Sequence, residues 1–335
     1  MTDQPKVTIL IPALNEERDI AGCIEAVAQQ DYPHEYIEVI VIDGVSEDDT
    51  VSTVLRAAKG YGIDSIRVLS NPRRRTSSSL NVGLLAANGA VIARLDARSR
   101  VEPSYLSRVV SSLEAEPGIG VVGGAQIAVP RTGRTIDLGI ARALGNRWTT
   151  GLSRYRRSML SGPSDTVWMG VFRTTELRRL GGWADDVALN EDYELNSRYR
   201  KAGFTVWFDA GLRSGYLPRP NLSGVARQHF YFGRAKGTLW ARGMVLTGRH
   251  RLLVTVPIAA GLLAAVVAKR IGSVRTALLF GSGVLLVDAR GGTGRAGLDV
   301  RMACGATMCA TTASWWVGSI VGYIGERMGL RHRHS

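Results

Sequence analysis

Cysteine is scarce in this chain of 335 residues, which has only Cys23, Cys304 and Cys309. They form no Cys-x-x-Cys pair and have no histidine nearby in the sequence, so neither a disulfide framework nor a structural zinc site is predicted. The first ten residues also lack the basic stretch and apolar core of a secretory signal. We therefore expect the main domain in a reducing compartment, the cytoplasm.

Acidic residues are outnumbered, because 42 Lys and Arg residues face 29 Asp and Glu residues, giving a formal net charge of +13. Such a charge favours phosphate-bearing partners, which include nucleic acid, sugar nucleotides and anionic lipid. The arginines are scattered, and no zinc-finger, helix-turn-helix or RNA-binding signature accompanies them, so no nucleic-acid partner is predicted.

Long uncharged apolar runs lie towards the C-terminal end, where residues 252–268 lack any charge and are bracketed by Arg and Lys. This run is just long enough to span a bilayer, and two further runs follow at 276–287 and 302–325. We predict a catalytic domain at 1–243 and a membrane-associated helical region at 244–335. A helical hairpin buried in a soluble domain is the alternative.

Strand-like and helix-like segments alternate before residue 243. The apolar runs at 7–13, 36–44, 66–71 and 90–97 predict strands, and the segments between them have helical spacing or helix-capping residues. Strand followed by helix implies parallel pairing. The sequence therefore predicts an α/β fold with an open, mostly parallel sheet whose loops gather at the carboxyl ends of the strands.

Acidic residues follow apolar runs at three places, namely Asp43, Asp96 and the pair Glu191 and Asp192. Carboxylates at the mouth of a sheet suit an enzyme that holds a nucleotide, a metal and a catalytic base in one crevice. Each site also has an ordinary structural explanation: an Asp-Gly turn, a helix cap, and an acidic first turn of a helix.

Four segments together resemble glycosyltransferase family 2, whose fold is GT-A. They are VTILIPALNEE, VIDGVSEDDT, the stretch from Asn81 to Asp96 that ends in RLDA, and NEDYELNSRYRKAG. The stretch DTVWMGVFR and the hydrophobic tail are most similar to membrane-attached glucosyltransferases of exopolysaccharide assembly, the succinoglycan type. The resemblance implies a GT-A fold over roughly residues 5–240, followed by C-terminal transmembrane helices.

A nucleotide-sugar donor site is implied by the same resemblance. Asp43 would accept a hydrogen bond from the base, and Asn81 would lie near the nucleotide. The nucleoside would be held beside Asp43 by Pro12, Ala13, Asn15 and Glu16. Of three consecutive arginines, Arg75 is the candidate for contact with the diphosphate, and a solvated loop is the alternative.

Asp96 lies where the family has an Asp-x-Asp motif that binds the ribose and a divalent metal. The motif here reads Asp96-Ala97-Arg98, so its third position carries a guanidinium in place of a carboxylate. We predict that Asp96 anchors Mg²⁺ or Mn²⁺ with other ligands. The alternative is that Arg98 supplies positive charge to the diphosphate directly.

Asp192 matches the family's catalytic base, which removes the proton of the acceptor hydroxyl during inverting transfer. Glu191 would orient the loops or the acceptor. We expect a nearby metal or arginine to hold the pKa of the Asp192 carboxyl down, because the base must stay ionised.

Further candidates follow from the same resemblance. Trp168 would stack on an acceptor sugar, with a buried core position as the alternative. Gln228 and Arg234 would close over the diphosphate. The Gln-x-x-Arg-Trp motif of processive relatives is absent, because Tyr231 and Phe232 occupy the matching positions.

The sequence therefore predicts an inverting, non-processive transferase that moves a hexose, glucose from UDP-glucose, to a lipid-linked saccharide at the cytoplasmic face of the cell membrane. Polysaccharide assembly proteins are candidate partners. One alternative is a polyprenyl-phosphate glycosyltransferase, and another is a catalytically silent membrane-bound scaffold. A nucleotidyltransferase would need a Gly-rich, Lys-bearing loop after the first strand, and PALNEERD is not one.

Overall fold

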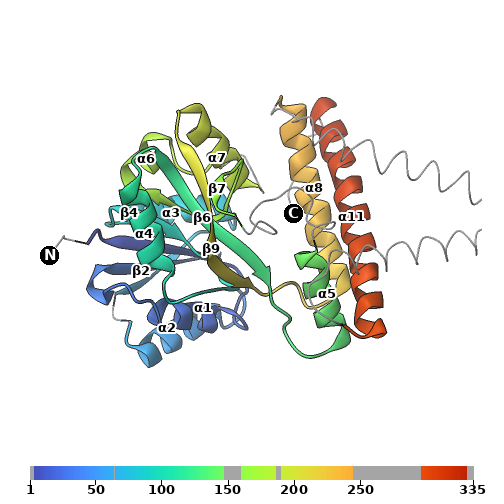
Figure 1. Cartoon of the computed structure of the whole chain (residues 1–335), viewed down its shortest axis with the longest axis horizontal. Coiled ribbons are helices and arrows are strands. Elements are labelled where there is room, and N and C mark those ends of the chain that lie inside the picture. The colour runs from blue at the N-terminus through green and yellow to red at the C-terminus, as the bar shows by residue number, and fades with distance from the viewer. Residues whose placement is uncertain (1–3, 64, 147–159, 186–189, 244–295, 330–335) are drawn as a thin grey trace, which may run out of the picture. The chain divides into compact units, whose positions relative to one another are not determined.

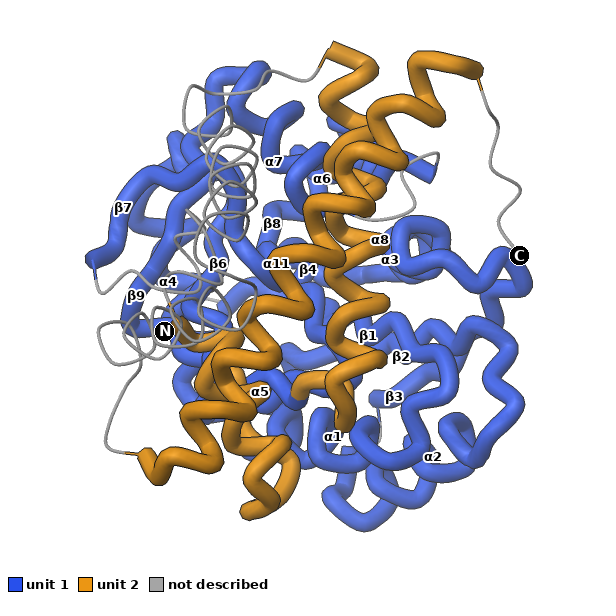
Figure 2. Tube along the Cα trace, turned by 90° about the vertical axis from the view of Figure 1, so that its right-hand side faces the viewer, with its two compact units in different colours: residues 1–127, 154–217 blue, residues 128–153, 218–335 orange. Residues whose placement is uncertain are grey.

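The computed structural model describes residues 4–63, 65–146, 160–185, 190–243 and 296–329 (Figure 1). The chain forms two compact units (Figure 2). Unit 1 contains residues 1–127 and 154–217, and unit 2 contains residues 128–153 and 218–335.

Unit 1 begins with four parallel strands in the order β3-β2-β1-β4. Helices α1 (Ile20–Ala28), α2 (Thr50–Tyr61) and α3 (Thr76–Ala86) connect them. The strands are β1 (Val7–Ala13), β2 (Ile37–Asp43), β3 (Ile66–Ser70) and β4 (Val91–Arg94), with a short 3-10 helix, His34–Tyr36, before β2. This half confirms the predicted parallel α/β arrangement.

Antiparallel strands complete the sheet, which continues from β4 in the order β8-β6-β9-β5. These strands are β5 (Ser99–Val101), β6 (Ile119–Ala128), β8 (Trp168–Arg173) and β9 (Thr205–Tyr216), and β7 (Gly162–Pro163) pairs with β9. Three helices accompany them: α4 (Tyr105–Ala115), α6 (Thr174–Arg179) and α7 (Glu191–Lys201).

The sheet is thus mixed, and the prediction of a mostly parallel sheet was wrong for its second half. The reason is that β8 is buried along nearly its whole length, so its apolar run lacks the in-and-out alternation that marks many antiparallel strands. Its pairing with β4 is antiparallel, with Ala93 opposite Val171.

The core of unit 1 lies between the sheet and its helices. Phe172 of β8 packs edge-on against Trp183, with ring centroids 5.7 Å apart, and lies 5.5 Å from the ring of Tyr199 on α7. All three side chains are buried. This packing anchors α7, whose first turn carries Glu191 and Asp192, against the sheet.

Unit 2 contains three described helices: α5 (Thr135–Gly145), α8 (Leu222–Ala241) and α11 (Leu298–Arg327). The helices α8 and α11 lie side by side (Figure 1) and approach closely at glycines. A Cβ at Gly237 would collide with the carbonyl oxygen of Ser319, and one at Gly322 with that of Arg234. Gly139 gives α5 the same close approach to Ala303 of α11.

The predicted C-terminal region is described only in part. The run 302–325 lies within α11, and the runs 252–268 and 276–287 lie outside the described residues. Among the helices that are described, none has both the length and the apolar character needed to cross a bilayer. The transmembrane helices and the domain boundary at residue 243 stay predictions.

Candidate active site

The turn after β2 encloses the carboxylate of Asp43, which is buried. Its Oδ1 accepts a hydrogen bond from Ser46 Oγ (2.6 Å), and its Oδ2 accepts one from the Ser46 backbone N–H (3.0 Å). Pro12 and Ala13 lie beside this turn, because Ala13 is opposite Asp43 in the strand register. The base of a bound nucleotide could therefore donate a hydrogen bond only to the remaining lone pairs of the Asp43 carboxylate.

The loop after β1 is tied to the same turn. The backbone N–H of Asn15 donates to Ser46 Oγ (2.9 Å), and Asn15 Oδ1 accepts from the Glu47 N–H (2.9 Å). The N–H of Glu16 donates to Thr50 Oγ1 (2.8 Å). The structure therefore brings together five of the predicted donor-binding residues: Pro12, Ala13, Asn15, Glu16 and Asp43.

Arg98 lies next to this group. Its Nε is 3.3 Å from Glu16 Oε1, and its guanidinium carbon is 5.8 Å from the centroid of the Tyr216 ring. Its Nη1 is buried and finds no hydrogen-bond acceptor in the part of the chain that the structure describes. A buried N–H without an acceptor is costly, so this nitrogen is suited to an anionic ligand.

Arg94, the last residue of β4, connects the three predicted acidic residues further along the chain. Its Nε donates to Asp96 Oδ1 (2.9 Å), and its Nη1 donates to Glu191 Oε1 (2.8 Å) and Asp192 Oδ1 (2.7 Å). The arginine is 6% exposed. Arg94 was not among the predicted site residues, although a charged residue inside the apolar run AVIARL is a signal of a buried ion pair.

Burial raises the pKa of the Asp192 carboxyl to about 7. Arg94 opposes this rise, while the negative charges of Glu191 and Asp96 add to it. Arg94 lowers this pKa, as predicted for a nearby arginine, but desolvation and the two like charges outweigh it, so the net direction is opposite to the expected one. The predicted effect of a bound metal stays a prediction. A carboxylate with a pKa near neutrality has the basicity expected of a general base.

Asp96 is also held by β8. Its Oδ2 accepts a hydrogen bond from Trp168 Nε1 (3.1 Å), and the Trp168 ring meets the Tyr216 ring edge-on at 6.1 Å. Trp168 is only 9% exposed. This placement favours the buried-core interpretation of Trp168 over a ring that stacks on the acceptor.

Asp96 is the candidate protein ligand for a divalent cation. Within the described ranges, no group of three or more His, Cys, Asp and Glu side chains is arranged to hold a metal ion. Each Asp96 oxygen accepts one described hydrogen bond, so lone pairs are left, and the side chain is 27% exposed. Mg²⁺ is commonly held by one or two carboxylates together with substrate phosphates, and Asp96 fits that arrangement.

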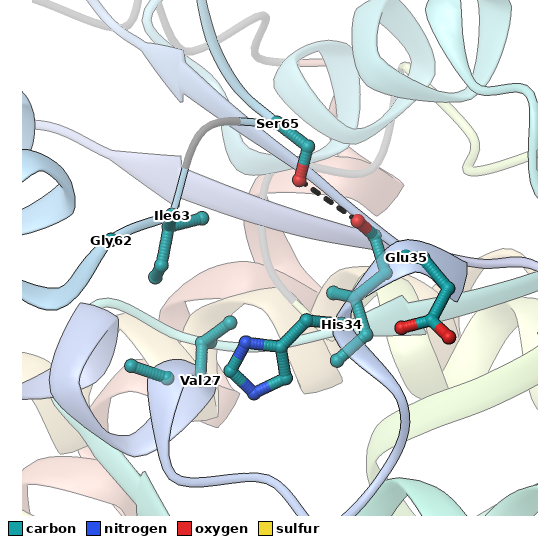
Figure 3. Close-up of a pocket in the computed structure, with 8 residues that line it drawn as sticks. Val27, His34, Glu35, Gly62, Ile63 and Ser65 are labelled. Atoms are coloured by element: carbon teal, nitrogen blue, oxygen red, sulfur yellow. Dashed lines mark hydrogen bonds between the residues drawn. The ribbon is translucent and has the colours of Figure 1, made fainter.

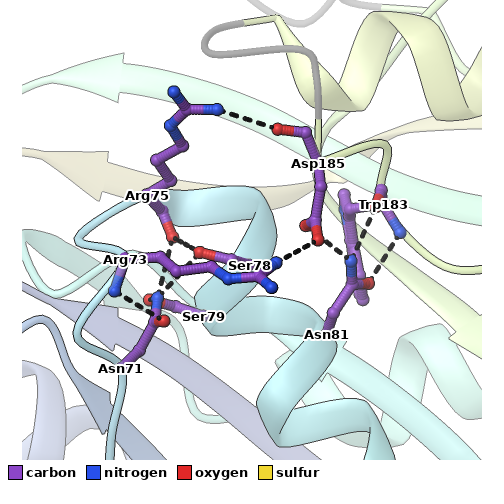
Figure 4. Close-up of polar contacts among 8 residues, drawn as sticks. All are labelled: Asn71, Arg73, Arg75, Ser78, Ser79, Asn81, Trp183 and Asp185. Atoms are coloured by element: carbon purple, nitrogen blue, oxygen red, sulfur yellow. Dashed lines mark hydrogen bonds and ion pairs between the residues drawn. The ribbon is translucent and has the colours of Figure 1, made fainter. Parts of the chain in front are cut away.

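Asn81 and Arg75 join a second polar cluster (Figure 4). The Asn81 amide donates to Trp183 O (2.7 Å) and Asp185 Oδ1 (3.1 Å) and accepts from the Trp183 N–H (2.9 Å). Arg75 Nη1 donates to Asp185 O (3.1 Å), and Arg73 forms an ion pair with the Asp185 carboxylate (3.0 Å). These side chains hold the segment 183–185, so their predicted contacts with the donor stay predictions. Asp185 was not predicted.

Gln228 and Arg234 lie on α8 in unit 2, and their contact with the diphosphate stays a prediction. A pocket of about 260 Å³ in unit 1 is lined by residues that include Val27, His34 and Ser65 (Figure 3). It lies at the amino ends of β2 and β3, the edge of the parallel strands opposite to Asp43, and none of the predicted site residues lines it.

Comparison with known proteins identifies the family. The model of the family described as "Glycosyl transferase family 2" matches residues 8–175, half of the chain. The chain belongs to glycosyltransferase family 2. It is therefore a glycosyltransferase, and the predicted resemblance is confirmed.

Two curated relatives of this glycosyltransferase match over most of both chains. A dolichyl N-acetyl-alpha-D-glucosaminyl phosphate 3-beta-D-2,3-diacetamido-2,3-dideoxy-beta-D-glucuronosyltransferase of Methanococcus voltae is 26% identical over 71% of this chain and 74% of its own length. The succinoglycan biosynthesis protein ExoA of Rhizobium meliloti (strain 1021) is 29% identical over 77% of this chain and 78% of its own.

Among solved structures, the mannosyltransferase PcManGT from Pyrobaculum calidifontis, in complex with GDP-Man and Mn²⁺, has a similar fold. The TM-score is 0.65 at 21% identity, and the match covers 96% of this chain and 88% of that one. The glycosyltransferase therefore has a GT-A-like α/β fold.

Proposed function

We propose that this glycosyltransferase moves a hexose, glucose from UDP-glucose, to a lipid-linked saccharide during cell-surface polysaccharide assembly, with inversion at the anomeric carbon. The observation that carries the proposal is the pairing of one buried guanidinium, Arg94, with both Asp96 and Asp192. This places a carboxylate suited to the donor beside a carboxylate suited to proton removal.

Asp192 is the general base of this proposal. The acceptor oxygen attacks the anomeric carbon of the donor sugar, and Asp192 takes the hydroxyl proton as the new bond forms. Arg94 donates to Asp192 Oδ1, so Oδ2 is the oxygen that would receive the proton. The bond between the sugar and the diphosphate breaks, and the nucleoside diphosphate leaves with the electron pair.

The diphosphate gains negative charge in this step and must be stabilised. When bound, Mg²⁺ or Mn²⁺ would neutralise part of this charge as a Lewis acid. Asp96 is the residue that would hold the cation, and phosphate oxygens would complete its ligands. Arg98, with its buried Nη1, would add a guanidinium, which suits phosphate oxygens. The residues around Asp43 would hold the nucleoside.

The acceptor class rests on the relatives, and the choice of glucose rests on the resemblance to succinoglycan-type glucosyltransferases. The name of the Methanococcus voltae relative describes transfer to a sugar on dolichyl phosphate, and ExoA takes part in succinoglycan biosynthesis. The GT-A structure of PcManGT contains GDP-Man and Mn²⁺, in keeping with a nucleotide sugar and a divalent cation here.

A membrane location, with the catalytic domain on the cytoplasmic side, is part of the proposal. Unit 2 carries 20 of the 42 Lys and Arg residues but only 4 of the 29 Asp and Glu residues, so the net positive charge of the protein comes from unit 2. Its helix α11 exposes Val317, Ile320 and Ile324 by 54%, 49% and 48%. Basic and apolar surfaces together suit an anionic bilayer. Confinement there would raise the local concentration of a lipid-linked acceptor.

The test is transfer by the detergent-purified protein from radiolabelled UDP, GDP and dTDP sugars, with and without Mg²⁺ or Mn²⁺, to a lipid extract. Glucose transferred from UDP-glucose to a lipid saccharide, with NMR showing an inverted anomeric configuration, is the expected result. A lipid phosphate as acceptor would favour the polyprenyl-phosphate alternative. Donor binding without turnover would favour the silent scaffold.

A further inference from the structure

We infer that Arg94 is a positioning residue of the transfer reaction, whose guanidinium fixes the place of the base Asp192 relative to Asp96. The inference rests on the proposed function, because it takes Asp192 as the base. It gives a role to a residue that is not among the predicted catalytic, donor, metal or acceptor residues.

The first observation is the position of Arg94 in the sheet. It is the last residue of β4, it lies opposite Leu10 of the central strand β1, and its side chain is 7% exposed. Burial of a guanidinium is unfavourable unless carboxylates surround it, and a residue that served packing alone would be apolar. The charge of Arg94 therefore matters at this place.

The second observation is that two nitrogens of Arg94 contact carboxylates from two different segments of the chain. Nε binds Asp96, which follows β4 in the chain, while Nη1 binds Glu191 and Asp192 in the first turn of α7. Two different nitrogens of one planar group thus hold carboxylates from segments almost a hundred residues apart. A planar fork sets the direction as well as the distance of its partners, which a lysine ammonium cannot do.

The third observation concerns the start of α7. Asn190, directly before the helix, has a φ of 63°, a conformation that non-glycine residues rarely adopt. Glu191 follows it and is buried against Arg94. The guanidinium thus determines the direction in which the Asp192 carboxylate projects at the entry to the helix.

The consequence is geometric. The base must meet an acceptor oxygen that approaches the donor sugar, and the place of the donor depends on Asp96 in the proposed function. A displacement of the base by about 1 Å costs on the order of 10²-fold in rate. The loss of Arg94 should therefore reduce kcat far more than it weakens donor binding.

The experiment compares Arg94→Lys and Arg94→Ala with the wild-type full-length protein. We expect kcat to fall roughly 10²-fold in both variants, with the KM for the donor changed less than about threefold. Guanidinium ion added to Arg94→Ala should restore at least about a tenth of the wild-type kcat, whereas methylammonium, with a single nitrogen, should not. A merely structural role would not produce this selective rescue.

Arg67→Lys is the matched control, because Arg67 pairs with Glu38 (2.9 Å) in the same sheet, away from Asp96 and Asp192. It should keep wild-type kcat. The inference is overturned if Arg94→Lys keeps its kcat within about threefold of wild type, or if its whole defect lies in donor KM. If neither Arg94 variant folds, Arg94→Met, which keeps most of the side-chain length but has no N–H donor, tests the same contacts with Asp96 and Asp192, and an unchanged kcat in that variant also overturns the inference.

Asp192→Asn separates this inference from the proposed function. If Asp192→Asn is as active as wild type, the proposed base is wrong, whatever the Arg94 variants do. If Asp192→Asn is inactive and Arg94→Lys is fully active, the proposed function stands and only the role of Arg94 fails.

Discussion

Lowering the pH from 8 to 5 should strongly reduce kcat/KM of the transferase, because Asp192 becomes protonated. Burial raises the pKa of this carboxyl to about 7, with Glu191 and Asp96 adding to the rise and Arg94 opposing it. A base acts only when it is ionised, so kcat/KM should be level above pH 7 and fall tenfold for each pH unit below it. At pH 5 the rate should be roughly 10²-fold lower than at pH 8.

Initial rates of UDP release at low donor concentration, at saturating acceptor, would measure this profile. A profile that stays flat between pH 5 and 8 would refute the assignment of Asp192 as a base with a raised pKa.

The pH dependence of conformational stability independently tests the direction of the Asp192 pKa shift. The folded protein keeps a proton on Asp192 up to about pH 7, whereas the unfolded chain loses that proton near the ordinary pKa of 3.8. The tighter proton binding of the folded state therefore contributes fully to stability below pH 3.8, and this contribution is lost as the pH rises through about 7. Asp192→Asn should remove that component from the pH dependence of the melting temperature.

Two further predictions concern stability, each measured by thermal and urea unfolding. Gly237→Ala should destabilise unit 2 by about 1–3 kcal/mol, because the new Cβ would collide with the Ser319 carbonyl oxygen. Gly133→Ala is the control and should not destabilise unit 2, because the space around Gly133 is open. Equal effects of the two substitutions would contradict the close helix packing. Asn81→Ala should lower the free energy of unfolding by about 1–3 kcal/mol, because it leaves the backbone N–H and carbonyl of Trp183 without their Asn81 partners. Arg73→Ala should lower it by less than about 1 kcal/mol, because the ion pair of Arg73 with Asp185 is exposed. A larger loss for Arg73→Ala than for Asn81→Ala would contradict these roles.

The sequence predicted the parallel half of the fold well, because β1 and β2 are strongly apolar and a helix follows each of β1, β2 and β3. The strand predicted at 7–13 forms at Val7–Ala13, and the strand predicted at 36–44 forms at Ile37–Asp43, one residue shorter at each end. The antiparallel half was harder, because buried antiparallel strands such as β8 carry no alternating pattern. Pairing between distant strands depends on packing that no local pattern encodes.

The candidate site was predicted in its parts but not in its connections. Local sequence signals are clear at three of its positions, because Asp43 ends β2, Asp96 follows the end of β4 by two residues, and Asp192 lies in the first turn of α7. The contact of Arg94 with Asp192 joins residues 98 positions apart, so spacing could not reveal it. The raised pKa of Asp192 depends on the burial of this carboxyl in the folded protein, which the local sequence does not show. The net shift of the pKa is therefore upward, opposite to the expected lowering.

Asp192→Asn tests whether Asp192 is the catalytic base. The measurement is transfer of glucose from UDP-glucose to lipid-linked acceptor by wild type and variant, with UDP binding measured by calorimetry on both proteins. We expect kcat to fall by a factor of about 10² to 10⁴ with the UDP affinity unchanged, because the variant lacks only the proton acceptor. A variant that transfers glucose at the wild-type rate would contradict this role of Asp192.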